Sequence, residues 1–351
     1  MRLVAKTERN SPMRDALMPV VAVAASLLVC ALLILLAGAN PVEAFGIMIS
    51  AAFWGKFALT ETLARAAPLM LSGLAALVAF RTRFWNIGGE GQIIVGAMAA
   101  AWIGALTLPT PLLIPFMLIG AALAAVPASL KTRFGVDEVV STLMLNFIVM
   151  YLMQALLSGP WKDPVTGWTN SPSILPAAEF PVFWSGTRLH LGVLLAFLSV
   201  AVIGIVMKRT TFGLSMKIVG ENPKSARHAG LNVSYVTLLA ALLSGALAGL
   251  AGAGEIGGIQ FQVIASISSG YGYAGIVVAM LARLSAAGII PAALFIAAIT
   301  TGADEMSRQT GVPFFIADAM QGICLIAVLV AMTLSRYEIR FRASPETKAT
   351  P

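Results

Sequence analysis

Side chains capable of chemistry gather in one short segment, residues 86–92, which lies between two long apolar stretches. The segment holds the carboxylate of Glu90, the amides of Asn86 and Gln92, and three glycines. A charge in such a setting is costly in a bilayer, so it needs a partner, a water-filled cavity or a place at the membrane edge. Glycines let the backbone break, and broken backbone at membrane depth must be covered by protein or line a cavity. The segment predicts either a pathway lining or a tight turn between helices.

Further polar positions interrupt other apolar stretches. Thr142 and Asn146 are four residues apart, so a helix places them on one face, where they either contact a solute or hydrogen-bond a neighbouring helix. Glu255 lies in a second glycine-rich break. The candidate pathway residues are therefore Asn86, Glu90, Gln92, Thr142, Asn146 and Glu255.

The sequence offers little for catalysis or metal binding. Cys30 and Cys324 both lie in apolar stretches, where we expect small core residues and neither a disulfide nor a zinc site. His190 and His228 are far apart along the chain. Because an enzyme needs clustered carboxylates, histidines or cysteines, we expect no catalytic and no metal-binding residues.

Composition assigns the chain to the integral membrane proteins. Of its 351 residues, 58% are hydrophobic and 11% charged, whereas a soluble domain is about 25% charged. The first apolar stretch, 18–39, follows a basic N-terminus. A cleaved signal peptide is the competing interpretation, but its apolar core spans only about 7–15 residues, so we favour an uncleaved membrane helix.

The apolar stretches predict an all-α integral membrane protein with about ten transmembrane helices, some of them broken. The expected ranges are 18–39, 63–80, 86–106, 112–130, 136–157, 189–207, 235–254, 273–284, 288–301 and 314–334. With the N-terminus inside, most of the 23 Lys and Arg residues fall on the inner side, as the positive-inside rule requires. We expect cytoplasmic tails at 1–17 and 336–351, a transmembrane domain at 18–335 and a cytoplasmic segment at 210–234.

A weak internal repeat accompanies this layout. Residues 71–77 resemble residues 243–249, each segment precedes a break that contains Gly and Glu, and the two copies cross the membrane in opposite directions. Inverted repeats with broken helices are typical of transporters. Chance similarity between two segments rich in small residues explains the match equally well. The small residues at 245, 249, 253 and 257 recur every four positions and predict a smooth ridge for close helix packing.

The cytoplasmic segment contains a second informative pattern. Asn222 suits a helix N-cap, Pro223 the first turn and Gly230 the C-terminal stop, which predicts a two-turn polar helix. An ordinary solvated loop is the simpler alternative. A capped helix between long membrane helices favours a docking element for a cytoplasmic partner, with the candidate residues Glu221, Asn222, Pro223, Lys224, Arg227, His228 and Gly230.

Three segments together carry a family resemblance. Residues 86–92, 135–146 and 219–223, the last followed by Ala229-Gly230, resemble permease subunits of bacterial ABC importers. The group that imports nucleosides and simple sugars, related to the ribose and branched-chain amino-acid permeases, is the most similar. The resemblance spans about residues 15–335 and implies that 18–335 is the permease domain. It also implies that the region around residues 221–231 is the coupling helix that docks on an ATP-binding subunit.

The resemblance implies a complete assembly. This chain and a second permease subunit, identical or paralogous, are expected to form the pathway in the bilayer of a bacterial cytoplasmic (inner) membrane, with both termini cytoplasmic. Two ATP-binding subunits that hold ATP and Mg²⁺ would drive transport, and an extracytoplasmic solute-binding protein would deliver the solute. This chain would hold no cofactor, hydrolyse no ATP and bind no nucleic acid.

Two alternatives stay open on the sequence. An ion-coupled secondary transporter would need carboxylate or histidine relays at helix centres, for which Glu90 and Glu255 are the candidates. An ABC permease for branched-chain amino acids would keep the assembly and change the solute.

Overall fold

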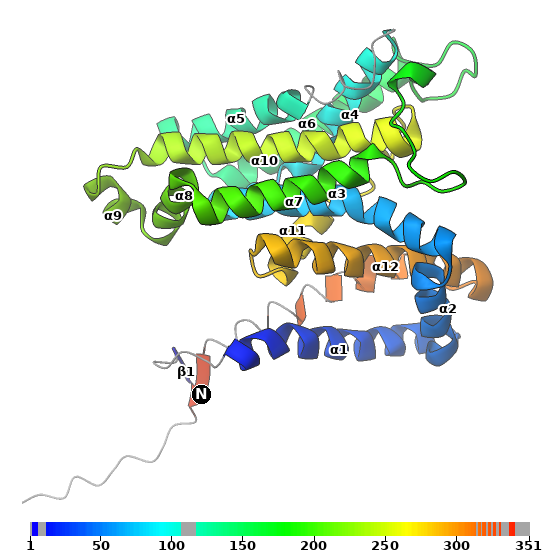
Figure 1. Cartoon of the computed structure of the whole chain (residues 1–351), viewed down its shortest axis with the longest axis horizontal. Coiled ribbons are helices and arrows are strands. Elements are labelled where there is room, and N and C mark those ends of the chain that lie inside the picture. Colours follow the sequence, from blue (N-terminus) through cyan, green and yellow to red (C-terminus); the bar gives the residue numbers. More distant parts are fainter. Residues whose placement is uncertain are drawn as a thin grey trace, which may run out of the picture. The chain divides into compact units, whose positions relative to one another are not determined.

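A computed structural model describes most of the chain, in two compact units (Figure 1). The described residues are 2–5, 12–106, 117–313, 315–316, 318–320, 322–323, 326–327, 330 and 337–340. One unit comprises residues 46–305 and the other residues 1–45 together with 306–351. The expected helical membrane fold is confirmed, and the described strands are one short antiparallel pair, β1 (Arg2–Ala5) and β2 (Tyr337–Arg340), in the smaller unit.

The larger unit is built from helices. Helix α1 (Pro12–Leu36) belongs to the smaller unit, and α2 (Pro41–Phe53) and α12 (Ala286–Thr310) each contribute to both units. The remaining helices are α3 (Lys56–Arg81), α4 (Gly89–Gly104), α5 (Met117–Phe134), α6 (Glu138–Ser158), α7 (Leu191–Arg209), α8 (Thr211–Glu221), α9 (Pro223–His228), α10 (Val233–Glu255) and α11 (Tyr271–Leu281). Short helical turns form at η2 (Pro176–Ala178) and, as a π-helix, at η3 (Ile256–Gln260).

The expected count of about ten membrane-crossing helices is not confirmed. Among the described residues, five helices are long and apolar enough to cross, namely α3, α6, α7, α10 with η3, and α12; the broken pair α1–α2 makes six. Helices α4 and α11 have 16 and 11 residues, and at about 1.5 Å per residue both are shorter than the roughly 30 Å apolar core. The short helix expected at 273–284 is observed as α11, and the helix expected at 314–334 lies largely outside the described residues.

Two helices form the centre of the larger unit. Within the most apolar part of each helix, 89% of the residues of α3 and 78% of those of α10 are buried, against 22% for α6 and 28% for α7. Most of the side chains of α6 and α7 therefore face away from the unit, as helices do that meet lipid or another subunit. The polar break between α3 and α4 is consequently attached to the most buried of the described spanning helices.

Small residues let α10 approach its neighbours closely, as their spacing predicts. A methyl group on Gly245 would overlap the backbone of Gly120 in α5, and one on Gly252 would overlap the carbonyl of Ile93 in α4. A methyl group on Gly96 would likewise meet the backbone of Gly249. The predicted packing ridge on α10 is confirmed at Gly245 and Gly249, and Gly252 adds a close contact outside the predicted spacing.

The two similar segments, residues 71–77 and 243–249, lie within α3 and α10. Each long helix is followed by a short one, α4 after α3 and α11 after α10. Helix α4 packs on α10, and α11 packs on α3, where Gly275 meets Ser72 and Gly73 meets Val278. Each short helix therefore packs against the long helix of the other proposed repeat copy. The inverted symmetry of the repeat stays a prediction.

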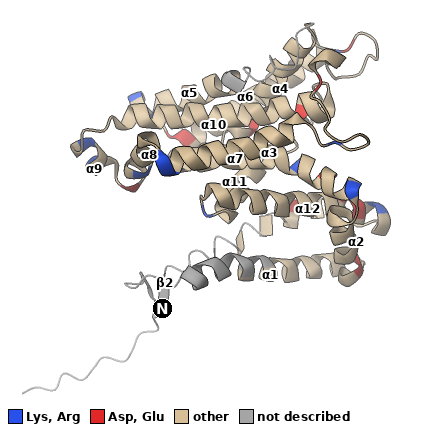
Figure 2. Ribbon diagram, in the orientation of Figure 1, with Lys and Arg blue, Asp and Glu red and all other residues tan. Residues whose placement is uncertain are grey.

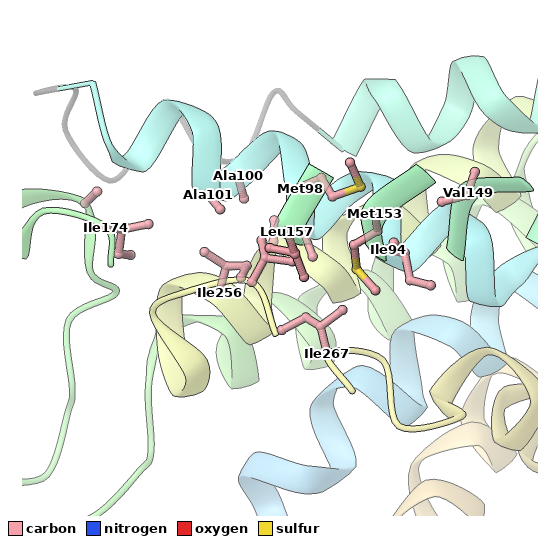
Figure 3. Close-up of a cluster of buried hydrophobic side chains, with 14 of the residues drawn as sticks. Ile94, Met98, Ala100, Ala101, Val149, Met153, Leu157, Ile174, Ile256 and Ile267 are labelled. Atoms are coloured by element: carbon pink, nitrogen blue, oxygen red, sulfur yellow. The ribbon is translucent and has the colours of Figure 1, made fainter. Parts of the chain in front are cut away.

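An apolar cluster holds the turn after α10 in place (Figure 3). Ile94 and Met98 of α4 face Met153 and Leu157 of α6, and Ile256 at the start of η3 packs among them. The cluster fixes the ends of α4, α6 and α10 to one another, so the connection that leads to α11 starts from a rigid base.

Candidate functional site

The break between α3 and α4 is closed by a buried amide pair. Asn86 donates hydrogen bonds from Nδ2 to Gln92 Oε1 (3.1 Å) and to Ser244 Oγ (3.0 Å), and its Oδ1 accepts one from Gln92 Nε2 (3.2 Å). Asn86 and Gln92 are 4% and 1% exposed. Ser244 Oγ in turn donates to the carbonyl of Ala75 (2.7 Å). Because buried polar groups are stable only when paired, this set joins the break to α10 and α3.

Polar side chains of α6 hydrogen-bond the backbone around the break between α3 and α4. Thr142 Oγ1 accepts a hydrogen bond from the backbone N–H of Ile87 (3.3 Å). Asn146 Oδ1 accepts one from the N–H of Gly91 (2.9 Å), while its Nδ2 donates to the carbonyl of Ile87 (2.9 Å). Asn146 Nδ2 also reaches the hydroxyl of Tyr273 in α11 (3.2 Å). Thr142 and Asn146 therefore bind the irregular backbone that the broken helix leaves unpaired.

Glu90 lies between the N-termini of two helices. It belongs to the first turn of α4, and its two carboxylate oxygens accept hydrogen bonds from the N–H groups of Gly270 (3.0 Å) and Gly272 (2.8 Å) at the start of α11. Gly272 lies against the backbone of Gly89 and Glu90, so closely that a methyl group there would overlap it. A carboxylate at a helix N-terminus is electrostatically favourable, and here it joins two helices.

Glu255 lies apart from the other five candidates. It ends α10, eleven residues beyond Ser244, which is about 16 Å along the helix axis. It is 3% exposed, and the charges acting on it are those of Arg65, Glu61 and Arg188. The structure therefore brings Asn86, Glu90, Gln92, Thr142 and Asn146 together and places Glu255 near a separate group of charges.

That group of charges is an ion-pair network. Arg65 pairs with Glu61 (3.2 Å) and with Asp304 of α12, and Arg188 pairs with the same Glu61 oxygen (3.3 Å). The end predicted for this helix, residue 301, is wrong, because Asp304 lies inside α12. Helix α12 continues to Thr310, and the Asp304 side chain is only 21% exposed because Arg65 holds it.

A second ion pair, between Glu138 and Lys131, lies at the Trp85 end of the break. Glu138 lies in the first turn of α6, where its charge is favourable near the helix N-terminus. It also accepts hydrogen bonds from Lys131 Nζ and from the N–H of Trp85 (3.3 Å). Asp137 does cap α6, accepting from the N–H groups of Val139 and Val140 at 2.8 and 3.2 Å.

The helix predicted from Asn222, Pro223 and Gly230 is confirmed as α9. Asn222 Oδ1 caps it by accepting hydrogen bonds from the N–H groups of Lys224 (3.0 Å) and Ser225 (3.2 Å). Gly230 follows its C-terminal end with φ +80°, a conformation that favours glycine. The candidates Glu221, Asn222, Lys224, Arg227, His228 and Gly230 are all exposed, and Pro223 is half-buried.

Helix α9 has one buried side chain, Ala226, and it packs against α8 and against the membrane helix α10. Gly220, near the end of α8, lies against the carbonyl of Arg81 at the end of α3, so that a methyl group at Gly220 would overlap that oxygen. Arg81 Nη2 also donates to the carbonyl of Leu284 after α11 (2.8 Å).

Sequence reasoning missed three members of the site. Ser244 and Tyr273 complete its hydrogen bonds, and Gly272 allows the close contact between α4 and α11. Ser244 lies inside the segment that resembles residues 71–77, which was a usable signal. Nothing local in the sequence marks Tyr273 or Gly272. Across the described residues, His, Cys, Asp and Glu side chains form no group of three or more that could hold a metal ion.

Comparison with known proteins gives consistent matches. The family model described as branched-chain amino acid transport system / permease component matches residues 58–331. A glucose ABC transporter permease protein of Haloferax volcanii is 33% identical over 92% of this chain and 89% of its own length. A guanosine ABC transporter permease protein of Bacillus subtilis is 33% identical over 93% of this chain and 94% of its own.

A third relative extends the same pattern. A nucleoside ABC transporter permease protein of Lactococcus lactis is 28% identical over 97% of this chain and 98% of its own length. No solved structure matches the chain.

Proposed function

Because the chain belongs to the family of branched-chain amino acid transport system permease components, we propose that it forms the pathway of an ATP-driven importer for nucleosides or simple sugars. In this proposal a second permease subunit, identical or paralogous, provides the other half of the pathway. The largely exposed apolar faces of α6 and α7 support a position in lipid or against such a subunit.

One observation carries the proposal, namely the capped helix α9. It exposes Lys224, Arg227 and His228 and buries Ala226, so it offers a rigid, basic surface to another molecule. Its connection through Gly220 to Arg81 supports a coupling role, since a force on α9 reaches the break between α3 and α4. The partner proposed for this surface is an ATP-binding subunit, which would hold ATP and Mg²⁺.

The orientation rests on the distribution of charge. Figure 2 shows Lys and Arg at the end of the larger unit where α8 and α9 lie. We place this end and both termini in the cytoplasm, as the positive-inside rule requires. The membrane is then a bacterial cytoplasmic (inner) membrane, and a solute-binding protein delivers solute to the opposite side.

The chemistry of the break supports an uncharged solute. Amides and hydroxyls are buried at its centre, both oxygens of the Glu90 carboxylate are occupied by backbone N–H groups, and the Glu138 carboxylate at its other end is paired with Lys131. An amino acid carries an ammonium and a carboxylate that need charged partners, whereas a nucleoside or sugar needs hydrogen-bonding groups. The names of the guanosine, nucleoside and glucose relatives agree with this choice.

The proposed pathway role differs among the candidate residues. The amide and hydroxyl groups of Asn86, Gln92, Thr142 and Asn146 are occupied within the chain, so they shape the pathway by holding its backbone. Glu90 is half-buried, so it can meet the pathway directly, as can Tyr273, which is 41% exposed. Glu255 would belong to the extracytoplasmic end.

Calorimetry on the solute-binding protein encoded beside this gene tests the solute class. Titration with nucleosides, simple sugars and branched-chain amino acids is expected to give micromolar or tighter binding for a nucleoside or a sugar. Tight binding of leucine or valine alone would instead favour the alternative that the family description names.

A further inference from the structure

A cavity of about 500 Å³ lies where two segments distant in the sequence meet. One wall comes from the loop between α6 and α7 and the other from the connection between η3 and α11. The lining residues are Thr166, Trp168, Thr169, Asn170, Gln262, Ile264 and Ala265. Both segments lie at the end of α10 opposite α9 (Figure 1), which is the extracytoplasmic side in the proposed orientation.

The two walls are joined by regular hydrogen bonds. Asn170 Nδ2 donates to Gln262 Oε1 (2.8 Å). Next to this pair, the N–H of Ser171 donates to the carbonyl of Val263 (3.0 Å), and the N–H of Val263 donates to Ser171 Oγ (2.9 Å). The N–H of Ile174 reaches the carbonyl of Phe261 (2.7 Å). The cavity is therefore a built feature of the fold, attached to the rigid turn after α10.

The lining has a defined chemistry. None of its seven residues is charged. Trp168 is 76% exposed, so its indole ring is accessible for stacking. The hydrogen bond between Asn170 and Gln262 uses the amide oxygen of Gln262. Within the described residues, Gln262 Nε2 and the Thr169 hydroxyl make no hydrogen bond. An aromatic face beside free amide and hydroxyl groups suits a neutral, planar, polar ring.

We propose that this cavity is an extracytoplasmic acceptance site for a nucleoside, whose base stacks on Trp168 while Gln262 and Thr169 hydrogen-bond it. The proposal deepens the proposed function and rests on it, since it names where the solute first meets this chain. The volume lies within the range of about 300–1,000 Å³ that is typical of small-molecule sites. Stacking on an aromatic side chain tolerates different bases, which suits an importer of several nucleosides.

Equilibrium binding to the full complex tests the site. The permease pair with its ATP-binding subunits is placed in lipid nanodiscs without the solute-binding protein and without ATP, and binding of radiolabelled guanosine and glucose is measured. Trp168→Ala is expected to weaken guanosine binding by about tenfold or more, the size typical for loss of base stacking. Trp168→Phe, which keeps an aromatic face, is expected to restore most of it, and Gln262→Leu to weaken it several-fold.

Two matched variants control for general damage. Trp184 lies in the same loop but outside the cavity, beneath Lys56 Nζ at 3.9 Å from its ring, so Trp184→Ala is expected to bind as the parent does. Gln260 lies in η3 and does not line the cavity, so Gln260→Leu is also expected to be neutral. Co-purification of the ATP-binding subunits verifies that each variant is assembled.

Four outcomes decide between the possibilities. Loss of guanosine binding in Trp168→Ala, together with its recovery in Trp168→Phe, supports the site. Failure of ATP-dependent uptake would contradict the proposed function and leave this result standing. Unchanged guanosine binding by both Trp168→Ala and Gln262→Leu overturns it, while transport can still stand. Trp168-dependent binding of glucose without guanosine overturns the nucleoside class. If Trp168→Ala and Gln262→Leu keep guanosine binding but lose docking of the solute-binding protein in a separate co-purification, the surface docks that protein and the proposed site is overturned.

Discussion

Asn86 donates a hydrogen bond to Ser244 across 3.0 Å and so joins the break between α3 and α4 to the middle of α10. Ser244 passes the connection to α3 through the carbonyl of Ala75. Since α3 and α10 are the most buried spanning helices described, the polar break is part of the rigid core and not a loose turn. Any motion that opens a pathway at α4 must either break this bond or move α10 with it.

Replacement of Ser244 tests how much this connection stabilises the fold. Ser244→Ala removes one member of the buried hydrogen-bonded group and leaves the Ala75 carbonyl without its donor. We therefore expect the free energy of unfolding to fall by about 1–3 kcal/mol. The measurement is thermal unfolding of the purified protein in detergent. Ser50→Ala is the control, because Ser50 is exposed on α2 and bonds its own helix at Ile47. Equal melting temperatures for the two variants would contradict a structural role for Ser244.

Glu90 is expected to hold α4 and α11 together through its charge. Glu90→Gln keeps the shape, but only one amide oxygen remains to accept from Gly270 or Gly272, and hydrogen bonds to a charged group are worth about 1.5–3 kcal/mol. We expect lower thermal stability and reduced uptake. Glu43→Gln, at an exposed first turn of α2, is expected to cost at most about 1 kcal/mol. The interpretation fails if both variants behave alike.

The contact of Gly220 with Arg81 is expected to couple α8 and α9 to the membrane helices. Gly220→Ala would push α8 away from the end of α3, so less solute should be transported per ATP hydrolysed in proteoliposomes. In Gly254→Ala the added methyl group has no described neighbour within 4 Å. This control should be neutral or gain up to about 1 kcal/mol from better helix propensity. Parental coupling in Gly220→Ala would remove the proposed route.

Helix α9 is expected to bind the ATP-binding subunit through its cap and its basic face. Asn222→Ala should destabilise α9 locally by about 0.5–2 kcal/mol. Arg227→Glu reverses an exposed charge without touching the cap. Both should reduce co-purification of the ATP-binding subunit, whereas Arg209→Glu, on an exposed residue at the end of α7, should not. Full co-purification with both α9 variants would exclude α9 as the docking element.

Local chemistry explains what could be predicted from the sequence. The cap and stop residues of α9 act on their own neighbours, so Asn222 and Gly230 were sufficient to define it. The ridge on α10 follows from a spacing of four, and the short α11 from the length of its apolar run. These features depend on few long-range contacts.

Features that depend on distant contacts could not be predicted. Asp304 is held by Arg65, which is 239 residues away in the sequence, so its position in a continued helix was not evident. The same limit applies to Glu90, whose partners Gly270 and Gly272 belong to another helix. The six pathway candidates share polar chemistry, but only the fold separates Glu255 from the other five.

ATP-dependent uptake of guanosine into proteoliposomes is the most direct measurement of the proposed role. The liposomes contain this chain, its partner permease and the ATP-binding subunits, and the solute-binding protein is added with guanosine on the other side. The expected result is accumulation that requires ATP and stops when this chain is left out. Equal accumulation without ATP, or transport by the isolated chain under an ion gradient, would contradict it.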